Sequence, residues 1–248
     1  RVTTVDGDSM NNIDEQLQEL VTANRILARE GVVDAYGHVS IRHPERPDRY
    51  ILSQSRAPDL VEVADLMEYT LEGDPIDQQG RAMYTERPIH GGIYEARDDV
   101  LAIVHNHSTT VIPFSVTDTP LRPILHLAAL TGPELPVWDI RDNFGDTNLL
   151  VTTMDQGRDL ARCLGGRRVS LMRGHGCVVA GKSIREVVMA SVYLQVNAGL
   201  LLESLRLGEV KYLSPGEIKM MTESQMSLTG QERAWEYWAN RAGRGRGE

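Results

Sequence analysis

The chain has 248 residues, of which 41% are hydrophobic and 25% charged, as in a globular protein of one large domain or two small ones. Its 26 Lys and Arg against 35 Asp and Glu give a net charge of −9, which argues against a general nucleic-acid binder, because such a protein needs a basic face. No apolar run approaches the ~20 residues that cross a bilayer, and residues 1–12 lack the apolar core of a signal peptide. A cytoplasmic protein without membrane or nucleic-acid partners is therefore expected.

The first half of the chain predicts one amphipathic helix, two strands and a second helix. Residues 13–30 carry apolar side chains at near-helical spacing, and Gly31 stands where a C-cap residue is expected. The second helix tolerates Pro88 because this residue falls in its first turn. The expected elements are Ile13–Glu30, His38–Arg42, Tyr50–Ser53 and Glu86–Arg97.

The second half predicts further strands mixed with helices. With no repeat and no low-complexity linker, this mixture favours a single α/β domain around a mostly antiparallel sheet. Residues 1–12 and the Arg/Gly-rich tail at 241–248 are expected to be flexible. The expected strands are Val100–Val104, Val169–Met172 and Cys177–Ala180, and the expected helices are Leu125–Leu130, Asp155–Leu164, Ser183–Leu207, one starting at Ser214, and a last one carrying Trp235, Tyr237 and Trp238.

Two histidines, His105 and His107, follow the apolar strand 100–104. In an extended segment the side chains of residues i and i+2 point to the same side, so the two imidazoles could hold one divalent metal ion. His175 stands between two glycines in an expected β-turn, where the backbone can turn sharply. Three such ligands would leave coordination positions open, as a catalytic site requires. Structural histidines without a metal are the alternative, and two cysteines are too few for a thiolate zinc site.

Four motifs, in this order along the chain, resemble the class II aldolase/adducin family over about residues 15–225: Gly37–Ser40, Thr85–His90, Val104–Ser108 and Arg173–Gly176. The resemblance implies a single three-layer α/β/α domain with a central, mainly antiparallel sheet, which we expect to span residues 13–240. It also implies a homo-oligomer, commonly a tetramer with active sites near subunit interfaces. By the same resemblance His105, His107 and His175 are the metal ligands. Glu86 falls on the catalytic acidic residue, which in some members also reaches the metal.

Two loops depart from the sugar-phosphate aldolases of that family. The chain has His38 where those enzymes have Asn in a Gly-Asn-x-Ser motif, and Ser53-Gln54-Ser55-Arg56 where they have a Thr-Gly-type phosphate loop. Without that glycine the backbone N–H groups are not expected to cradle a phosphate. Arg56 instead offers a planar bidentate donor that suits a carboxylate, although an exposed loop arginine is the alternative.

These departures resemble a branch of the family that decarboxylates hydroxylated aromatic dicarboxylic acids, including 3,4-dihydroxyphthalate and 3-hydroxy-2-methylpyridine-4,5-dicarboxylate decarboxylases. In this hypothesis a divalent ion acts as a Lewis acid on an ortho hydroxyl and carboxylate. Glu86 or His126 delivers a proton to carbon. His126 stands roughly where the aldolases have a catalytic tyrosine, and an ordinary histidine is the alternative there. The second carboxylate is expected to contact Arg56, His38, Ser40 and Ser55.

Ligand type leaves the metal open, because three imidazoles suit Zn²⁺ whereas an added carboxylate and a chelating substrate suit Mn²⁺ or Fe²⁺ as well. By resemblance, manganese fits the decarboxylase branch and zinc fits the aldolases. A first alternative function is an aldolase or epimerase acting on a sugar phosphate or small hydroxy-keto acid, with Glu86 as base. A second is an adducin-like binding module, which predicts lost metal ligands, whereas the three histidines and Glu86 are all present here.

Overall fold

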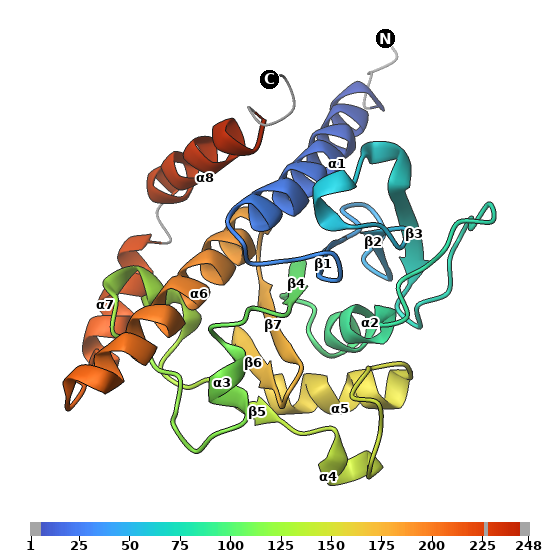
Figure 1. The fold of residues 1–248 in the computed structure, drawn as a ribbon. Coiled ribbons are helices and arrows are strands. Elements are labelled where there is room, and N and C mark those ends of the chain that lie inside the picture. Colours follow the sequence, from blue (N-terminus) through green and yellow to red (C-terminus); the bar gives the residue numbers. More distant parts are fainter. Residues whose placement is uncertain (1–5, 226–227, 244–248) are drawn as a thin grey trace.

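The computed structural model describes residues 6–225 and 228–243, and their elements form three layers (Figure 1). The middle layer is a seven-stranded sheet in the order β3-β2-β1-β4-β7-β6-β5. All neighbouring strands are antiparallel except β5 and β6. The expected three-layer α/β fold around a mainly antiparallel sheet is thus confirmed. The strands are β1 (His38–Arg42), β2 (Arg49–Ser53), β3 (Leu66–Thr70), β4 (Ala102–Asn106), β5 (Val137–Trp138), β6 (Val169–Met172) and β7 (Gly176–Gly181).

Helices cover both faces of the sheet. One group, α1, α6 and α8, packs together on one face, and α2 packs against α5 on the other (Figure 1). The longer helices are α1 (Asp6–Arg29), α2 (Arg87–Ala96), α5 (Met154–Leu164), α6 (Ile184–Leu207), α7 (Pro215–Gln225) and α8 (Leu228–Gly243). The short ones are α3 (Ile112–Ser115), α4 (Arg141–Phe144), and the 3-10 helices η1 (Pro58–Leu60), η2 (Val63–Asp65) and η3 (His126–Thr131).

Strand β4 divides its side chains between the two hydrophobic cores. Ala102 and Val104 belong to the core under α1 and α6, whereas Ile103 belongs to the core under α2 and α5. Because side chains alternate along a strand, His105 points to the same face as Ile103. The register pairs His105 with His38 on β1, so both imidazoles lie on the α2 face. This alternation decides on which side of the sheet the candidate site is built.

Most of the expected elements are present, with shifts of one or two residues at their ends. The first helix is longer than expected, because it starts at Asp6 rather than Ile13. The sequence did not predict β3, β5, α3 or α4, which are short or lie at the sheet edge. The last helix is confirmed as α8, and Trp238 is buried with its ring 5.8 Å from Tyr193 on α6. Of the two terminal segments, residues 1–5 and 244–248 lie outside the described part of the chain.

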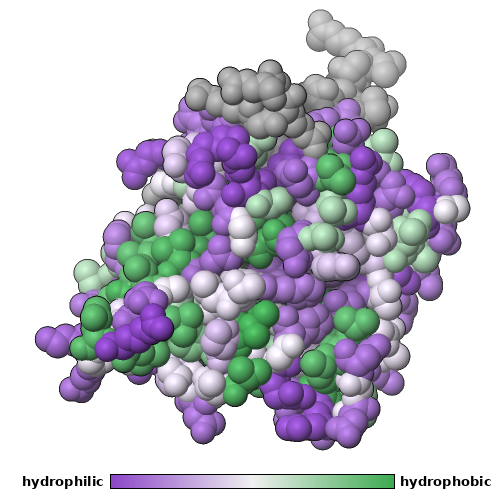
Figure 2. Space-filling view, viewed as in Figure 1, coloured by the Kyte–Doolittle hydropathy of each residue, from purple (hydrophilic) through white to green (hydrophobic). Residues whose placement is uncertain are grey.

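Helix α6 is apolar on more than one side. Its inner residues, such as Val188 and Leu201, are buried in the core, while Val196, Leu200 and Leu207 are exposed. Figure 2 shows hydrophobic surface on this side of the molecule. By length and composition alone α6 could span a membrane, which was not expected from the sequence. However, 56% of its most apolar window is buried inside the fold, as in the core helix of a globular protein.

Glycines allow α2 and α5 to cross with their backbones in contact. A Cβ atom added to Gly157 on α5 would lie 2.0 Å from the carbonyl oxygen of Pro88, and one added to Gly92 would lie 2.4 Å from the carbonyl carbon of Gly157. Real Cβ atoms cannot approach backbone this closely, so the crossing requires glycine at both positions. Helix α2 follows directly after Glu86, and this close crossing therefore fixes one side of the candidate site.

The substitution Gly157→Ala should destabilise the fold by about 2–3 kcal/mol, because the added methyl group forces the two helices apart. The sign of this change in the free energy of unfolding is informative, since replacing glycine by alanine within an exposed helix normally stabilises a protein by about 1 kcal/mol. Chemical denaturation measures the difference. Gly166→Ala is the control, because nothing lies within 4 Å of a Cβ built there. Equal stability of the two variants would contradict the tight crossing.

Candidate metal centre

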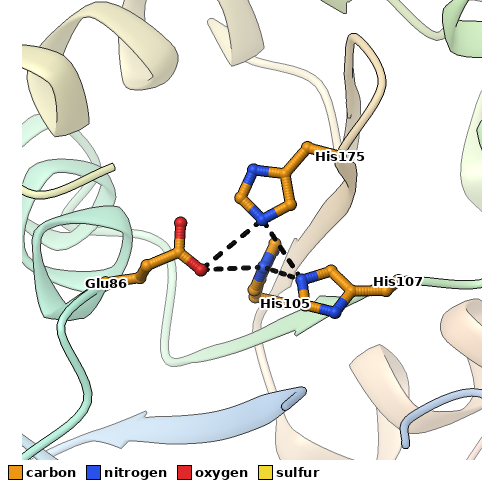
Figure 3. Close-up of side chains that lie close together, drawn as sticks. All are labelled: Glu86, His105, His107 and His175. Carbon is orange, nitrogen blue, oxygen red and sulfur yellow. Dashed lines mark hydrogen bonds and ion pairs between the residues drawn. The ribbon is translucent and has the colours of Figure 1, made fainter. Parts of the chain in front are cut away.

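Four side chains from three separate segments converge at one end of the sheet (Figure 3). Their ligand atoms all lie within 4.8 Å of one another, and they belong to Glu86, His105, His107 and His175. The Nε2 atoms of His105 and His175 lie 3.0 and 3.1 Å from that of His107. Oε2 of Glu86 lies 3.6 and 3.5 Å from Nε2 of His105 and His175, respectively. The structure thus brings together the four residues expected at a metal site.

Local backbone features bring these ligands to one point. His105 is the second-last residue of β4, and His107 follows the end of that strand. His175 lies in the turn between β6 and β7, where Gly174 adopts a positive φ of 64°. Gly176 allows β7 to approach β4, since a Cβ there would lie 2.1 Å from the carbonyl oxygen of Asn106. The flanking glycines of His175 therefore have the role that the sequence predicted for them.

Backbone carbonyls fix the tautomers of two of the imidazoles. Nδ1 of His105 donates to the carbonyl of Cys177 at 3.1 Å, and Nδ1 of His175 donates to the carbonyl of Leu149 at 3.0 Å. A carbonyl can only accept, so in a neutral ring the hydrogen is on Nδ1 and the lone pair is on Nε2. Both lone pairs therefore point into the cluster, which is the usual arrangement of a metal-ligating histidine.

The four converging atoms are electron-pair donors, and a positive charge among them would stabilise this arrangement. Lone pairs of His105 and His175 face the carboxylate oxygen of Glu86, and a single N–H on His107 could not satisfy them all. Burial lowers the pKa of His105 and lowers that of His107 to about 4, so these two rings do not readily take up a second proton. A divalent cation bound by three imidazoles and one carboxylate fits the donor set.

Glu86 is held as a carboxylate. It stands at the N-cap position of α2, and its Oε1 accepts a 2.9 Å hydrogen bond from the backbone N–H of Val151. Burial alone would raise its pKa, but positive charge on His105 and His175 outweighs burial and moves the pKa of this carboxyl well below its usual range. A divalent cation among the neutral imidazoles would have the same effect. Oε1 is thus occupied by the backbone, while Oε2 points to the histidines.

A buried chain of hydrogen bonds lies behind the ligands. Nδ1 of His38 lies 2.6 Å from Nε2 of His90, Nδ1 of His90 lies 2.6 Å from Oγ of Ser40, and this oxygen lies 2.9 Å from the Tyr94 hydroxyl. All four side chains are buried, and the His38 ring packs against His105 at 4.9 Å between centroids. His38 and Ser40, expected to contact substrate, are thus buried next to His105 and His90, and their contact with substrate stays a prediction. No role was predicted for His90, although its i, i+4 spacing from Glu86 is the spacing of residues on one side of a helix.

The loop that carries Ser55 and Arg56 lies beside this chain. The His38 ring packs against Tyr84 at 4.7 Å between centroids, and the Tyr84 hydroxyl donates to the carbonyl of Arg56. Ser55 is exposed. Nη1 of Arg56 pairs with the buried carboxylate of Asp65 at 2.7 Å, which orients the guanidinium of a side chain that is 40% exposed. Two ring contacts, His105 to His38 and His38 to Tyr84, thus connect the centre to the loop.

His126 lies on none of the three segments that carry the four-residue cluster. It is an exposed residue at the start of η3, which packs against α6 and α7. The cluster that could hold a metal does not include it. Its suggested role as proton donor stays a prediction.

The chain matches the family described as Class II Aldolase and Adducin N-terminal domain over residues 18–202. A protein named Decarboxylase tropJ from Talaromyces stipitatus is 32% identical over 244 residues, which cover 90% of this chain and 92% of that protein. A 3,4-dihydroxyphthalate decarboxylase from Arthrobacter keyseri is 26% identical over 85% of this chain and 84% of its own length. The solved structure of L-fuculose 1-phosphate aldolase from Glaciozyma antarctica has the same fold, with a TM-score of 0.76 and 22% identity over 98% of this chain and 93% of that one.

Burial of His90 predicts a pH dependence of stability in the metal-free protein. Burial lowers the pKa of His90 to about 3 in the fold, whereas in the unfolded chain it is about 6.5. Between these two pH values only the unfolded chain binds the proton. The contribution of neutral, buried His90 to the free energy of unfolding is therefore fully present above pH ~6.5 and is lost as the pH falls toward 3. His90→Gln should weaken this dependence by up to about 1.4 kcal/mol per pH unit, measured by chemical denaturation at about pH 4 to 7.

The exposed His126 provides the control for this experiment. His126→Gln also removes one histidine but leaves the buried chain intact. A pH dependence that is the same in wild type and His90→Gln would contradict the assigned protonation state of His90.

Proposed function

The chain belongs to the class II aldolase and adducin family, and we propose that it is a divalent-metal-dependent decarboxylase that removes CO₂ from a hydroxylated aromatic dicarboxylate resembling 3,4-dihydroxyphthalate. Lyase activity is supported by relatives named decarboxylases and aldolases. The observation that carries the proposal is the convergence of three imidazole nitrogens and one carboxylate oxygen, a donor set that suits a divalent cation. With all four ligands present, an adducin-like module without a metal is disfavoured.

In this proposal His105, His107, His175 and Glu86 hold the metal ion. When bound, a divalent cation supplies Lewis-acid stabilisation of the negative charge that loss of CO₂ leaves on the substrate. Neutral imidazoles leave that cation most of its charge, and Glu86 offsets part of it. The backbone contacts of His105, His175 and Glu86 hold these side chains in place before a substrate arrives.

A second group of residues is proposed to recognise the carboxylate that is not lost. Arg56 and Ser55 lie on a loop that contacts the centre through Tyr84 and His38. Since Asp65 occupies Nη1 of Arg56, the other edge of the guanidinium is assigned to the substrate. His38 and Ser40 are buried, so they are assigned to orienting the ligands from behind rather than to direct contact with substrate.

The proton that replaces CO₂ on the ring needs a donor. Glu86 is a poor donor because its pKa lies well below the usual range and its carboxylate belongs to the cluster. The proposal therefore assigns proton delivery to His126, whose exposed position on η3 leaves it accessible.

The alternative is an aldolase or epimerase acting on a sugar phosphate or small hydroxy-keto acid. It is supported by the relative named L-fuculose phosphate aldolase from Escherichia coli, 26% identical over 62% of this chain and 68% of that protein. Both reactions use the same ligands, so the distinction rests on the loop at Arg56. An arginine paired with a carboxylate, rather than a glycine-rich loop, favours a carboxylate substrate over a phosphate.

The central experiment follows CO₂ release from 3,4-dihydroxyphthalate by metal-reconstituted protein, beside cleavage of a sugar phosphate. We expect CO₂ from the aromatic substrate, complete loss after a chelator, and recovery when Mn²⁺, Zn²⁺ or Fe²⁺ is returned. His175→Ala should reduce the rate at least about 100-fold, because it removes a ligand. Formation of an aldehyde or dihydroxyacetone phosphate, without CO₂ from the dicarboxylate, would instead support the aldolase.

Arg56→Ala should raise KM for the dicarboxylate more than it lowers kcat. Loss of a charge-assisted hydrogen bond of about 1.5–3 kcal/mol corresponds to a rise of about 10- to 100-fold. Steady-state kinetics measure the two constants separately. Arg46→Ala is the matched control, because Arg46 is likewise a partly exposed arginine paired with a carboxylate, that of Glu68. Equal KM values for both variants would remove Arg56 from the site.

A further inference from the structure

A short irregular segment between α4 and α5 contacts two of the ligands through its backbone. The carbonyl of Leu149 accepts from Nδ1 of His175 at 3.0 Å, and the N–H of Val151 donates to Oε1 of Glu86 at 2.9 Å. Glu86 and His175 lie far apart in the sequence, the first just before α2 and the second between β6 and β7. Residues 149–151 therefore join two ligands that no strand or helix connects.

Leu149 has an unusual backbone conformation. Its φ is +67°, and among the described residues it shares a positive φ outside glycine with Gln79 alone. The left-handed region crowds Cβ against the backbone, and leucine lacks the short polar side chain that lets Asn or Asp enter it. Such a conformation persists only where the surroundings impose it, and it is found preferentially at functional sites.

The surroundings of Leu149 impose this conformation from both sides. Before it, Oγ1 of Thr147 accepts from the Leu149 N–H at 3.0 Å, and Oδ1 of Asn148 accepts from the Leu150 N–H at 3.1 Å. After it, Val151 is fully buried. The Leu149 side chain also packs near Gly174, with its Cδ1 3.8 Å from a Cβ built there. The carbonyl of Leu149 is thus aimed at His175 by contacts on its own segment and on the neighbouring turn.

We propose that residues 149–151 form a positioning strap for the metal centre, in which the left-handed backbone of Leu149 orients His175 and the N–H of Val151 orients Glu86. The inference rests on the proposed metal site. Through the carbonyl, the strap keeps the Nε2 lone pair of His175 directed into the cluster. Through the N–H, it occupies one carboxylate oxygen of Glu86 and leaves the other for the cation. The strap acts by positioning and contacts neither metal nor substrate in this role.

The test compares two substitutions of Leu149 that differ in their tolerance of positive φ. Leu149→Ile keeps the volume and polarity of the side chain, but a β-branched residue is strongly disfavoured in the left-handed region, whereas Leu149→Asn is tolerated there. Gln79→Ile is the matched control, because it places the same β-branched residue at the other positive φ, in an exposed turn. Thermal unfolding of the metal-free proteins shows how much each substitution lowers the stability of the fold.

The readout is the affinity of the metal-stripped full chain for Zn²⁺, measured by competition with a chromophoric chelator, together with the visible absorption of the Co²⁺ form. Leu149→Ile should weaken Zn²⁺ binding about 10-fold or more and alter the Co²⁺ bands, as loss of an outer contact to a ligand does. Leu149→Asn should stay within about threefold of wild type. Gln79→Ile should lose thermal stability with unchanged Zn²⁺ affinity.

Zn²⁺ affinity of Leu149→Ile equal to that of wild type, with unaltered Co²⁺ bands, would overturn the strap. Equal losses of affinity in Leu149→Ile and Leu149→Asn would also overturn it, because the backbone conformation would then be irrelevant. Failure of the proposed function is a separate outcome. In that case the wild-type chain itself binds neither Zn²⁺ nor Co²⁺ at the cluster, or it binds them and releases no CO₂.

Discussion

The candidate metal centre depends on one electrostatic constraint: four electron-pair donors converge, and a positive charge among them would stabilise their arrangement. Carbonyl oxygens fix the tautomers of neutral His105 and His175, so without a cation their lone pairs and a carboxylate oxygen of Glu86 face one another across less than 5 Å. In a water-poor site such repulsion is strong. The fold accepts it because specific backbone contacts hold three of the ligands, His105, His175 and Glu86. A cation that enters the cluster converts this repulsion into attraction, and binding of metal and stability of the fold become coupled.

The sequence predicted the parts of this centre that depend on local geometry. The i, i+2 pair of His105 and His107 is a property of an extended chain, and the glycines around His175 are a property of a tight turn. Contacts between distant segments could not be predicted in the same way. The N–H of Val151 and the carbonyl of Leu149 are backbone groups, so their contacts cannot be inferred from the types of these residues, yet they contact two of the ligands.

The same distinction between local sequence pattern and contacts of distant segments explains which helices and strands could be predicted. Helices α1, α5 and α6 are long enough for their apolar spacing and capping residues to be recognised. Strand β5 has only Val137 and Trp138, and it exists because β6 offers it a parallel partner. The direction of a polar side chain is equally a matter of tertiary contact. His38 and Ser40 carry groups that suit a substrate, but the register of β1 with β4 turns them toward His90 under α2.

Because aldolase and decarboxylase chemistry use the same kind of centre, specificity must arise outside the four ligands. The Arg56–Asp65 pair is informative in this respect. Asp65 is buried and orients the guanidinium through Nη1, and it also neutralises much of its charge. A doubly charged phosphate therefore gains little from net charge at this loop, and binding depends on directional N–H donation. A planar carboxylate matches the remaining edge of a planar guanidinium better than a tetrahedral phosphate does when no glycine-rich backbone supplies further donors. The loop that replaces the phosphate cradle thus favours substrates by geometry rather than by charge.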